Sequence, residues 1–156
     1  MGFDADKFMQ TNITGPTSTA VLVCPEGEYR AVVDDGDKAI TARSFPGKDG
    51  KPDSHQMQVL FSILDDSAKL AVKRDKCLVP NSIWLDVNEN GDLDLSEGRN
   101  VGIGRLRKAL GQNDGSWNPG MMKGKGPVMV KVSHRADPKD PTIKYAEVTR
   151  VSAIGS

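Results

Sequence analysis

Hydrophobic and polar residues alternate over several stretches of the chain, and this alternation predicts a protein built mainly from β-strands. The clearest case is His55–Leu64. Its apolar positions are Met57, Val59, Phe61 and Ile63, and its polar positions include Gln56, Gln58 and Ser62. Because successive side chains of a strand point to opposite faces, this segment should be a half-buried strand with a polar outer face.

Four further segments have the composition of strands, being rich in Val, Ile, Tyr and Thr. They are Glu28–Asp34, Cys77–Leu85, Val128–Arg135 and Thr142–Ile154. Pro80 interrupts the second of them, and proline cannot donate to a β-ladder, so this strand should lie at a sheet edge. The long polar stretch Asp34–Ser54 contains many turn-forming residues and is predicted to be a flexible hairpin loop.

One segment, Asn100–Asn113, has helical periodicity instead. Its apolar face carries Ile103, Leu106 and Leu110. Asn100 is the expected N-cap, and Gly111 is the expected stop. Gly102 and Gly104 weaken the first turn, by about 1 kcal/mol each relative to alanine. Two interpretations of these glycines stay open, namely close packing against a sheet or the approach of a phosphate to the helix N-terminus.

The order of these elements is three strands, one helix and a final pair of strands. This order favours a mainly β fold, a small antiparallel five-stranded OB-like barrel with one helix between the third and fourth strands. Residues 1–25, rich in Thr, Ser and Gly, are predicted to form an N-terminal arm, and residues 26–156 a single domain. The apolar runs are too short to cross a membrane. The chain starts without the basic and apolar segments of a signal peptide, so we expect an intracellular protein.

Charge changes this picture, because it is unevenly distributed although the net charge is zero. Residues 1–97 carry 10 basic and 17 acidic side chains, whereas residues 98–135 carry eight basic side chains and one acidic one. The eight are Arg99, Arg105, Arg107, Lys108, Lys123, Lys125, Lys131 and Arg135. A basic segment of this kind is typical of a surface that binds a polyanion, most simply nucleic acid. The alternative is an ordinary solvated face.

The stretch DVNENGDLDLSE at Asp86–Glu97 has the spacing of a calcium-binding EF-hand loop, with Gly91 at the sharp turn and Leu93 directed to the core. Its candidate ligands are Asp86, Asn88, Asn90, Asp92, Asp94 and Glu97. However, Pro80 argues against the incoming helix of an EF-hand, and Asn90 followed by Gly91 is itself a good hairpin turn. The sequence therefore leaves a weak calcium site and an acidic turn as alternatives, and it favours the turn.

The sequence does not predict an enzyme. Its two histidines, His55 and His134, have no neighbour in the sequence that would make a nucleophile pair. Cys24 and Cys77 lack the CxxC spacing of redox and metal sites, so we expect two reduced, buried thiols. No cofactor is expected, apart from the open question of calcium.

The motifs resemble those of a known family. The run NVGIGRLRKALGQN at residues 100–113, together with VKVSHR and YAEV further on, is similar to small phage-encoded proteins of replication and recombination modules. The resemblance covers roughly residues 25–155. It implies an OB-like fold, single-stranded DNA binding without catalysis, and a location in the cytoplasm of the infected bacterial host. The chain departs from the family by the complete ligand set in its acidic loop.

From the basic segment and the resemblance, we predict that seven residues bind the nucleic acid. They are Arg99, Arg105, Arg107, Lys108, Trp117, Lys131 and Arg135. Proteins that bind single strands also need exposed aromatic rings on which bases stack. The four candidates for stacking are Tyr29, Trp84, Trp117 and Tyr145. A structural or virion-associated protein that assembles with its own copies, through pairing of its oppositely charged segments, is the alternative function.

Overall fold

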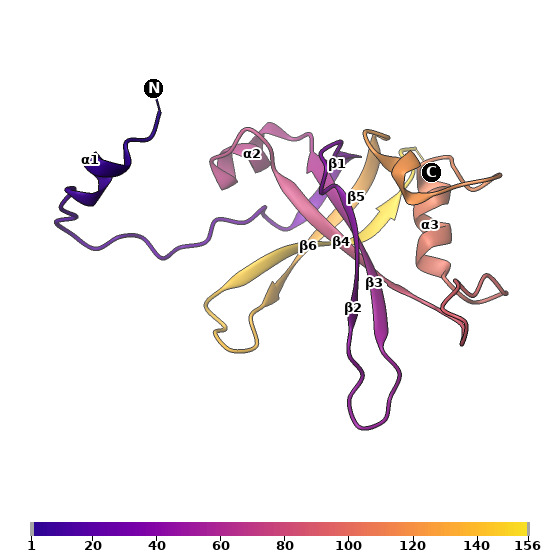
Figure 1. Ribbon diagram of the computed structural model, residues 1–156. Helices are drawn as coiled ribbons and strands as arrows, with labels where there is room; N and C mark the ends of the chain where they lie inside the picture. Colours follow the sequence, from indigo (N-terminus) through magenta and orange to yellow (C-terminus); the bar gives the residue numbers. More distant parts are fainter. Residues whose placement is uncertain (1, 156) are drawn as a thin grey trace.

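The computed structural model describes residues 2–155, and these residues form one antiparallel sheet with a few short helices (Figure 1). The strands are β1 (Gly27–Val33), β2 (Ile40–Phe45), β3 (Ser54–Ile63), β4 (Leu78–Leu85), β5 (Val128–Ala136) and β6 (Lys144–Ser152). The helices are α1 (Ala5–Met9), α2 (Asp66–Val72), α3 (Val101–Ala109) and the 3₁₀ turn η1 (Pro119–Met122). The predicted mainly β antiparallel architecture is thus confirmed.

The sheet has six strands, not the predicted five, because the polar stretch after β1 contains a strand. β2 pairs with β3 from Ile40 opposite Val59 to Phe45 opposite Ser54. Five of its six residues are exposed, and such a strand shows no alternation of apolar and polar residues in the sequence. The prediction of a flexible loop over Asp34–Ser54 was therefore wrong for its middle part.

β3 is the central strand and pairs along both of its edges. On one edge it pairs first with β2 and then with β1, whose ladder joins Ala31 to Ile63 and Val33 to Phe61. On the other edge it pairs with β4 along its whole length, and the ladder continues through Pro80, which lies opposite Leu60. β1 and β2 thus follow one edge of β3 in succession, separated by the turn at residues 34–39.

The remaining strands extend the sheet from β1 through β5 to β6. β6 also lies close to β4, where the amide of Asn81 donates a hydrogen bond of 2.9 Å to the carbonyl oxygen of Val148. Among residues 2–155, no backbone ladder joins β4 to β6. β4 therefore keeps one edge without a strand partner, as Pro80 predicted.

The core lies on the inner face of this curved sheet. The alternation in β3 predicted that face correctly, since Met57, Val59, Phe61 and Ile63 are all buried. β5 contributes Val128, Val130 and Val132 in the same way. α3 covers the core with Ile103 and Leu106. On the outer face of β3, however, Gln56 is only 8 % exposed, although the alternation predicted a solvated side chain.

α3 is shorter than the predicted helix, and its two ends behave differently. Gly111 follows the helix with a positive φ of 71°, as expected for a glycine stop. At the start, Asn100 makes no side-chain cap hydrogen bond and has a left-handed backbone, with φ 50° and ψ 37°. Its amide instead donates to the carbonyl oxygens of Asp86 and Asp94. Asn100 therefore stands at the predicted N-cap position, but its side chain fastens the acidic loop and does not cap the helix.

The N-terminal segment extends away from the sheet (Figure 1). Within residues 2–26 the only regular element is α1, which has no buried residue. Cys24, at the end of this segment, is the first residue in the core. No helix within residues 2–155 is both long enough and apolar enough to span a membrane.

Candidate nucleic-acid interface

A cleft of about 940 Å³ lies along the outer face of β2, β3 and β4. The start of β6, the end of β5 and residues 22–24 of the N-terminal segment form its other side. We call it the aromatic cleft, because the rings of Phe45, Trp84 and Tyr145 line it. The loops that join β2 to β3 and β5 to β6 both project downward in Figure 1, beside the ends of the strands that carry Phe45 and Tyr145.

The three rings of the aromatic cleft are exposed, although large aromatic side chains are usually buried. Phe45 is 38 % exposed, Trp84 59 % and Tyr145 40 %. The rings of Phe45 and Trp84 are tilted by 59°, with their centroids 5.7 Å apart. Phe45 on β2 and Trp84 on β4 stand on either side of β3, and both rings are open enough to solvent to stack with a flat ligand.

Arginine side chains lie over two of these rings. The guanidinium of Arg43 is 5.5 Å from the centroid of Phe45, and that of Arg135 is 5.5 Å from the centroid of Tyr145. Arg74 and Lys76 also line the cleft, and its one carboxylate, Glu147, lies 3.5 Å from Arg135. The cleft therefore combines stacking surfaces with an excess of positive charge, which suits a ligand that carries both flat rings and phosphates.

Tyr145 is held in place at the base of the β5–β6 loop. Its hydroxyl donates a hydrogen bond of 2.8 Å to the carboxylate of Asp137. This bond lowers the pKa of Asp137 and raises that of Tyr145. The ring thus keeps its orientation beside Arg135 without being buried.

Only part of this cleft was predictable from the sequence. Trp84, Tyr145 and Arg135 were candidates, but Phe45 and Arg43 lie in the stretch that was predicted to be a loop. The sequence held one indication of this face, because Arg43 and Phe45 are two residues apart and would point to the same side of a strand. Tyr29 was also a stacking candidate, but it packs against the core and donates to the carbonyl oxygen of Pro25.

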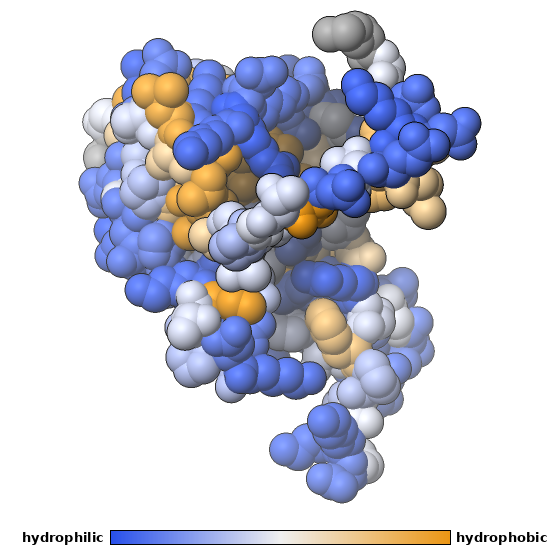
Figure 2. All heavy atoms as spheres, turned by 90° about the vertical axis from the view of Figure 1, so that its left-hand side faces the viewer, coloured by the Kyte–Doolittle hydropathy of each residue, from blue (hydrophilic) through white to orange (hydrophobic). Residues whose placement is uncertain are grey.

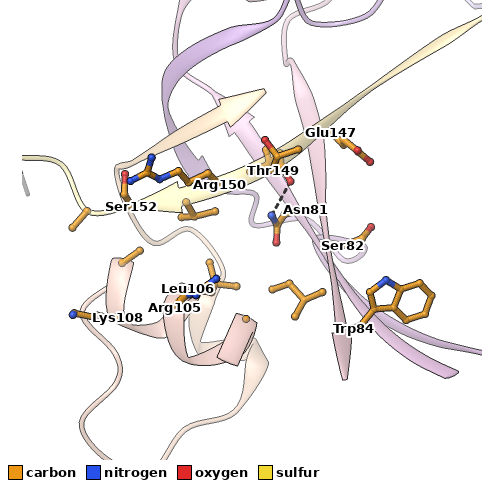
Figure 3. A pocket seen from close by; sticks show the side chains of 16 residues that line it. Asn81, Ser82, Trp84, Arg105, Leu106, Lys108, Glu147, Thr149, Arg150 and Ser152 are labelled. Atoms are coloured by element: carbon orange, nitrogen blue, oxygen red, sulfur yellow. Dashed lines mark hydrogen bonds between the residues drawn. The ribbon is translucent and has the colours of Figure 1, made fainter. Parts of the chain in front are cut away.

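A second groove, of about 1030 Å³, runs between α3, β4 and β6 (Figure 3). We call it the helix groove. Its cationic side chains are Arg105 and Lys108 from α3 and Arg150 from β6. Ser82, Trp84 and Glu147 line both this groove and the aromatic cleft, so the two are contiguous. The predicted residues Arg105 and Lys108 therefore lie beside the cleft that holds Arg135.

Arg107 and Trp117, which were predicted to contact the ligand, are engaged with each other instead. The Arg107 guanidinium lies 5.0 Å from the Trp117 ring centroid and donates to the carbonyl oxygens of Gln112 and Gly115. The Trp117 indole donates to the Gln112 side chain, and its ring packs against the core. Both residues thus close the loop after α3, and the structure places neither of them in the two grooves.

Arg99 and Lys131 also lie outside both grooves. Arg99 is directed to the acidic loop, where its nitrogens are 4.0 Å from the Asp86 carboxylate and 3.9 Å from that of Asp94. Lys131 is exposed on β5. Of the seven predicted residues, the structure therefore places Arg105 and Lys108 in the helix groove and Arg135 in the aromatic cleft, and it gives Arg99 and Arg107 structural contacts.

The acidic loop is a tight hairpin-like turn. Asn88 and Asp92 are joined by a backbone hydrogen bond of 2.8 Å, and Gly91 has a positive φ of 86°. Asp86 accepts from the backbone of Asn100, and Asp94 accepts from Ser96. Leu93 and Leu95 are 43 % and 79 % exposed, so the predicted core position of Leu93 was wrong.

The carboxylates of this turn are not clustered. Within residues 2–155, no group of three or more acidic, histidine or cysteine side chains is close enough to hold a metal ion. Asp86, Asn88 and Asp94 use side-chain oxygens as acceptors for the loop's own amides. Asp86 and Asp94 each keep one carboxylate oxygen that these bonds do not use, so calcium binding by this turn is still to be tested.

The histidines and cysteines have structural partners. His55 shares a hydrogen bond of 2.7 Å with Ser44 across the β2–β3 ladder, and His134 one of 2.7 Å with the carbonyl oxygen of Cys24. Burial raises the pKa of Cys24 to about 12 and also raises that of Cys77, so both stay protonated thiols at neutral pH. Protonated, buried thiols are poor nucleophiles and pack as small apolar groups.

No protein-family model, no curated protein and no solved structure matches this chain. The geometry described above is therefore the basis for assigning a function.

Proposed function

We propose that the protein binds single-stranded DNA without catalysis and that the aromatic cleft is the binding site. The observation that carries this proposal is the set of three exposed rings, Phe45, Trp84 and Tyr145, with arginines over two of them. Bases stack on such rings regardless of sequence, and the cations of the cleft neutralise phosphates. In a duplex the base faces are already stacked, so the cleft favours single strands.

The connectivity supports an OB-like arrangement for the domain. If β1 and β2 are counted as one interrupted strand, the order is three strands, α3 and two strands. In that arrangement, the nucleic-acid face consists of the second and third strands and the loops beside them. Here these strands correspond to β3 and β4, which form the floor of the aromatic cleft. We further propose a role in phage replication or recombination, supported by the sequence resemblance.

The test is a titration of a fluorescein-labelled 15-nucleotide mixed-sequence strand, followed by anisotropy at several salt concentrations. We expect saturable binding that weakens with salt, because each phosphate contact adds about 0.7 to the log–log slope. The same sequence as a duplex should bind more weakly. The variant in which Phe45 and Trp84 are both replaced by alanine should lose most of the affinity. Full affinity in that variant, or no binding at low salt, would disprove the proposal.

A second candidate function, self-association through the N-terminal arm, is favoured by a different observation. Phe3, Phe8, Met9 and Ile13 are between 56 % and 80 % exposed, although they are apolar. Figure 2, which views the molecule from the arm's side, shows apolar groups on an otherwise largely hydrophilic surface. A second copy of the chain would cover such residues. Sedimentation equilibrium of the full chain and of residues 21–156 tests this, and a monomeric full chain would disprove it.

A further inference from the structure

The side chain of Gln56 is buried in the floor of the aromatic cleft and has an unused acceptor. Gln56 is 8 % exposed, and its Oε1 is the one buried side-chain nitrogen or oxygen atom in residues 2–155 that has no hydrogen-bond partner. Such an unpaired acceptor is costly, so nearly all buried polar atoms in folded proteins are paired. A ligand that supplies the missing donor would remove this cost.

Gln56 lies between the groups that would hold a base. In the strand register it is opposite Arg43 on one side and opposite Trp84 on the other, and all three line the aromatic cleft. Neighbouring strands are about 4.8 Å apart, which is within the width of a base. A base stacked on Trp84 and extending toward β2 therefore places its edge above Gln56. Trp84 is 59 % exposed, so its ring has room to shift together with the stacked base and admit the edge of the base to the Gln56 amide.

The bases differ in the hydrogen-bond donors that they could offer to Gln56. The Oε1 atom accepts a hydrogen bond from an N–H group. Cytosine, adenine and guanine carry an exocyclic amino group, whereas thymine and uracil carry a carbonyl at the position equivalent to that of cytosine's amino group. The N–H donor of thymine and uracil on that edge, at N3, lies between two carbonyl oxygens that would repel Oε1. We infer that Gln56 recognises the exocyclic amino group of a stacked base, so that the cleft prefers amino-bearing bases and discriminates against thymine and uracil. This inference rests on the proposed binding of single strands.

The experiment compares two 15-nucleotide strands, one of deoxycytidine and one of deoxyuridine, at pH 8 in the same salt. Their rings have the same size, and they differ at the 4-amino group and the adjacent ring nitrogen. We expect the deoxycytidine strand to bind about fivefold more tightly or better, as one hydrogen bond of ordinary strength would give. Equal affinities would overturn the inference and leave the proposed function intact. The absence of binding to either strand would count against the proposed function itself.

The variant Gln56→Met removes the acceptor and keeps the length of the side chain. It should reduce the ratio of the two affinities to about one, mainly by weakening the deoxycytidine complex. The matched control is Gln58→Met, because Gln58 lines the same cleft on the same strand and has no unpaired buried atom. That control should keep the ratio. Equal weakening of both complexes by Gln56→Met would overturn the inference, since it would show a general contact.

A third strand tests the inference in the unmodified protein, whether or not the variants fold. Its bases are 2-pyrimidinone, which keeps the ring and the N3 acceptor of cytosine but lacks the 4-amino group. We expect it to bind as weakly as the deoxyuridine strand. Binding as tight as that of the deoxycytidine strand would assign the preference to the ring nitrogen and overturn the role of the Gln56 oxygen.

Discussion

At the scale of single residues, the two tryptophans have opposite environments. Trp84 is 59 % exposed in the aromatic cleft, whereas Trp117 is half-buried, packs against the core and is covered by Arg107. A ring that is open to solvent is available for stacking, but a ring whose face and N–H group are both engaged is not. The sequence could not distinguish the two, because Trp84 stands between two apolar residues and Trp117 between two polar ones, the reverse of what their exposure would suggest.

This difference gives the first prediction. Trp84→Ala should weaken binding of a single strand by about 1–3 kcal/mol, the usual value of a stacked base, and leave the melting temperature nearly unchanged. Trp117→Ala should lower the free energy of unfolding by about 2–4 kcal/mol, because it removes packing and leaves Arg107 without its ring. Anisotropy titration and thermal unfolding of both variants measure the two effects. Loss of stability in Trp84→Ala with unchanged affinity would contradict the assignment.

Asp34 gives the second prediction. Its carboxylate is buried, which acts to raise its pKa, but hydrogen bonds from Lys76, at 3.1 Å, and from the backbone of Gly36 outweigh burial and lower the pKa. A lowered pKa stabilises the fold above the unfolded value of about 3.9, and this contribution is lost as the pH falls through the folded value.

We therefore expect Asp34→Asn to destabilise the protein by about 1–2 kcal/mol at pH 7, a modest value because the Lys76 side chain is 59 % exposed. The difference from the unchanged protein should shrink as the pH falls from about 5 to 2. Urea unfolding at several pH values measures it. Asp35→Asn is the control, because Asp35 is exposed and lies 3.9 Å from Lys76. An Asp34→Asn effect that does not depend on pH would refute this account.

At the scale of elements, the two glycines of α3 have different reasons to be there. A Cβ atom on Gly102 would lie 2.9 Å from Cγ2 of Ile83 on β4, whereas one on Gly104 would meet nothing within 4 Å. The first glycine therefore allows the helix to pack closely on the sheet. Of the two interpretations that the sequence left open, close packing holds for Gly102, and neither packing nor strain explains Gly104.

The third prediction follows from this pair. Gly104→Ala should stabilise the protein by about 0.5–1 kcal/mol, because alanine has the higher helix propensity and finds free space. Gly102→Ala has the same gain in propensity, but Ile83 must shift, so it should be neutral or destabilising by up to about 2 kcal/mol. Chemical unfolding of the two variants side by side measures the difference. Equal stabilisation by both would refute the packing role of Gly102.

The elements also show what the sequence could and could not predict. β3 and β5 were predicted correctly because each has one fully buried apolar face and a more polar face that is mostly less buried, and the burial of the apolar face imposes the alternation. β2 was missed because neither of its faces is buried: its stability comes from the ladder with β3, which leaves no pattern in the sequence. With β2, the sequence analysis also missed Phe45 and Arg43, and hence one side of the aromatic cleft.

At the scale of the whole molecule, the predicted basic segment is distributed by the fold to several places. Arg99 and Arg107 stabilise loops, whereas Arg105 and Lys108 line the helix groove. Conversely, the cations Arg43, Arg74 and Lys76 of the aromatic cleft come from the acidic part of the sequence, residues 1–97. Net charge along the chain therefore indicated a polyanion-binding protein but did not locate its surface, because charges distant in sequence meet only in the folded sheet.

The two grooves together define a path longer than the aromatic cleft alone. They share Ser82, Trp84 and Glu147, so a strand that stacks on Trp84 can continue into the helix groove (Figure 3). There it meets Arg105, Lys108 and Arg150 and no aromatic ring other than Trp84. The aromatic cleft should therefore bind the bases, whereas the helix groove should bind mainly the phosphates of the continuing strand.

The fourth prediction tests this path through its dependence on strand length. Replacing Arg105 and Lys108 together by glutamine should leave the affinity for a strand of about 5 nucleotides unchanged, because the aromatic cleft alone accommodates it. For a strand of about 15 nucleotides the variant should bind more weakly, with a log–log salt slope lower by about 1.4, the value for two phosphate contacts. Anisotropy titrations at three salt concentrations measure both quantities. The matched control replaces Arg99 and Lys131 by glutamine, which removes the same charge outside both grooves. The control should change neither the affinity nor the salt slope for either strand.

Two outcomes would contradict this path. An equal loss of affinity for short and long strands would show that α3 lies beside the first bases bound. An equal loss in the control variant would show that net charge alone determines affinity.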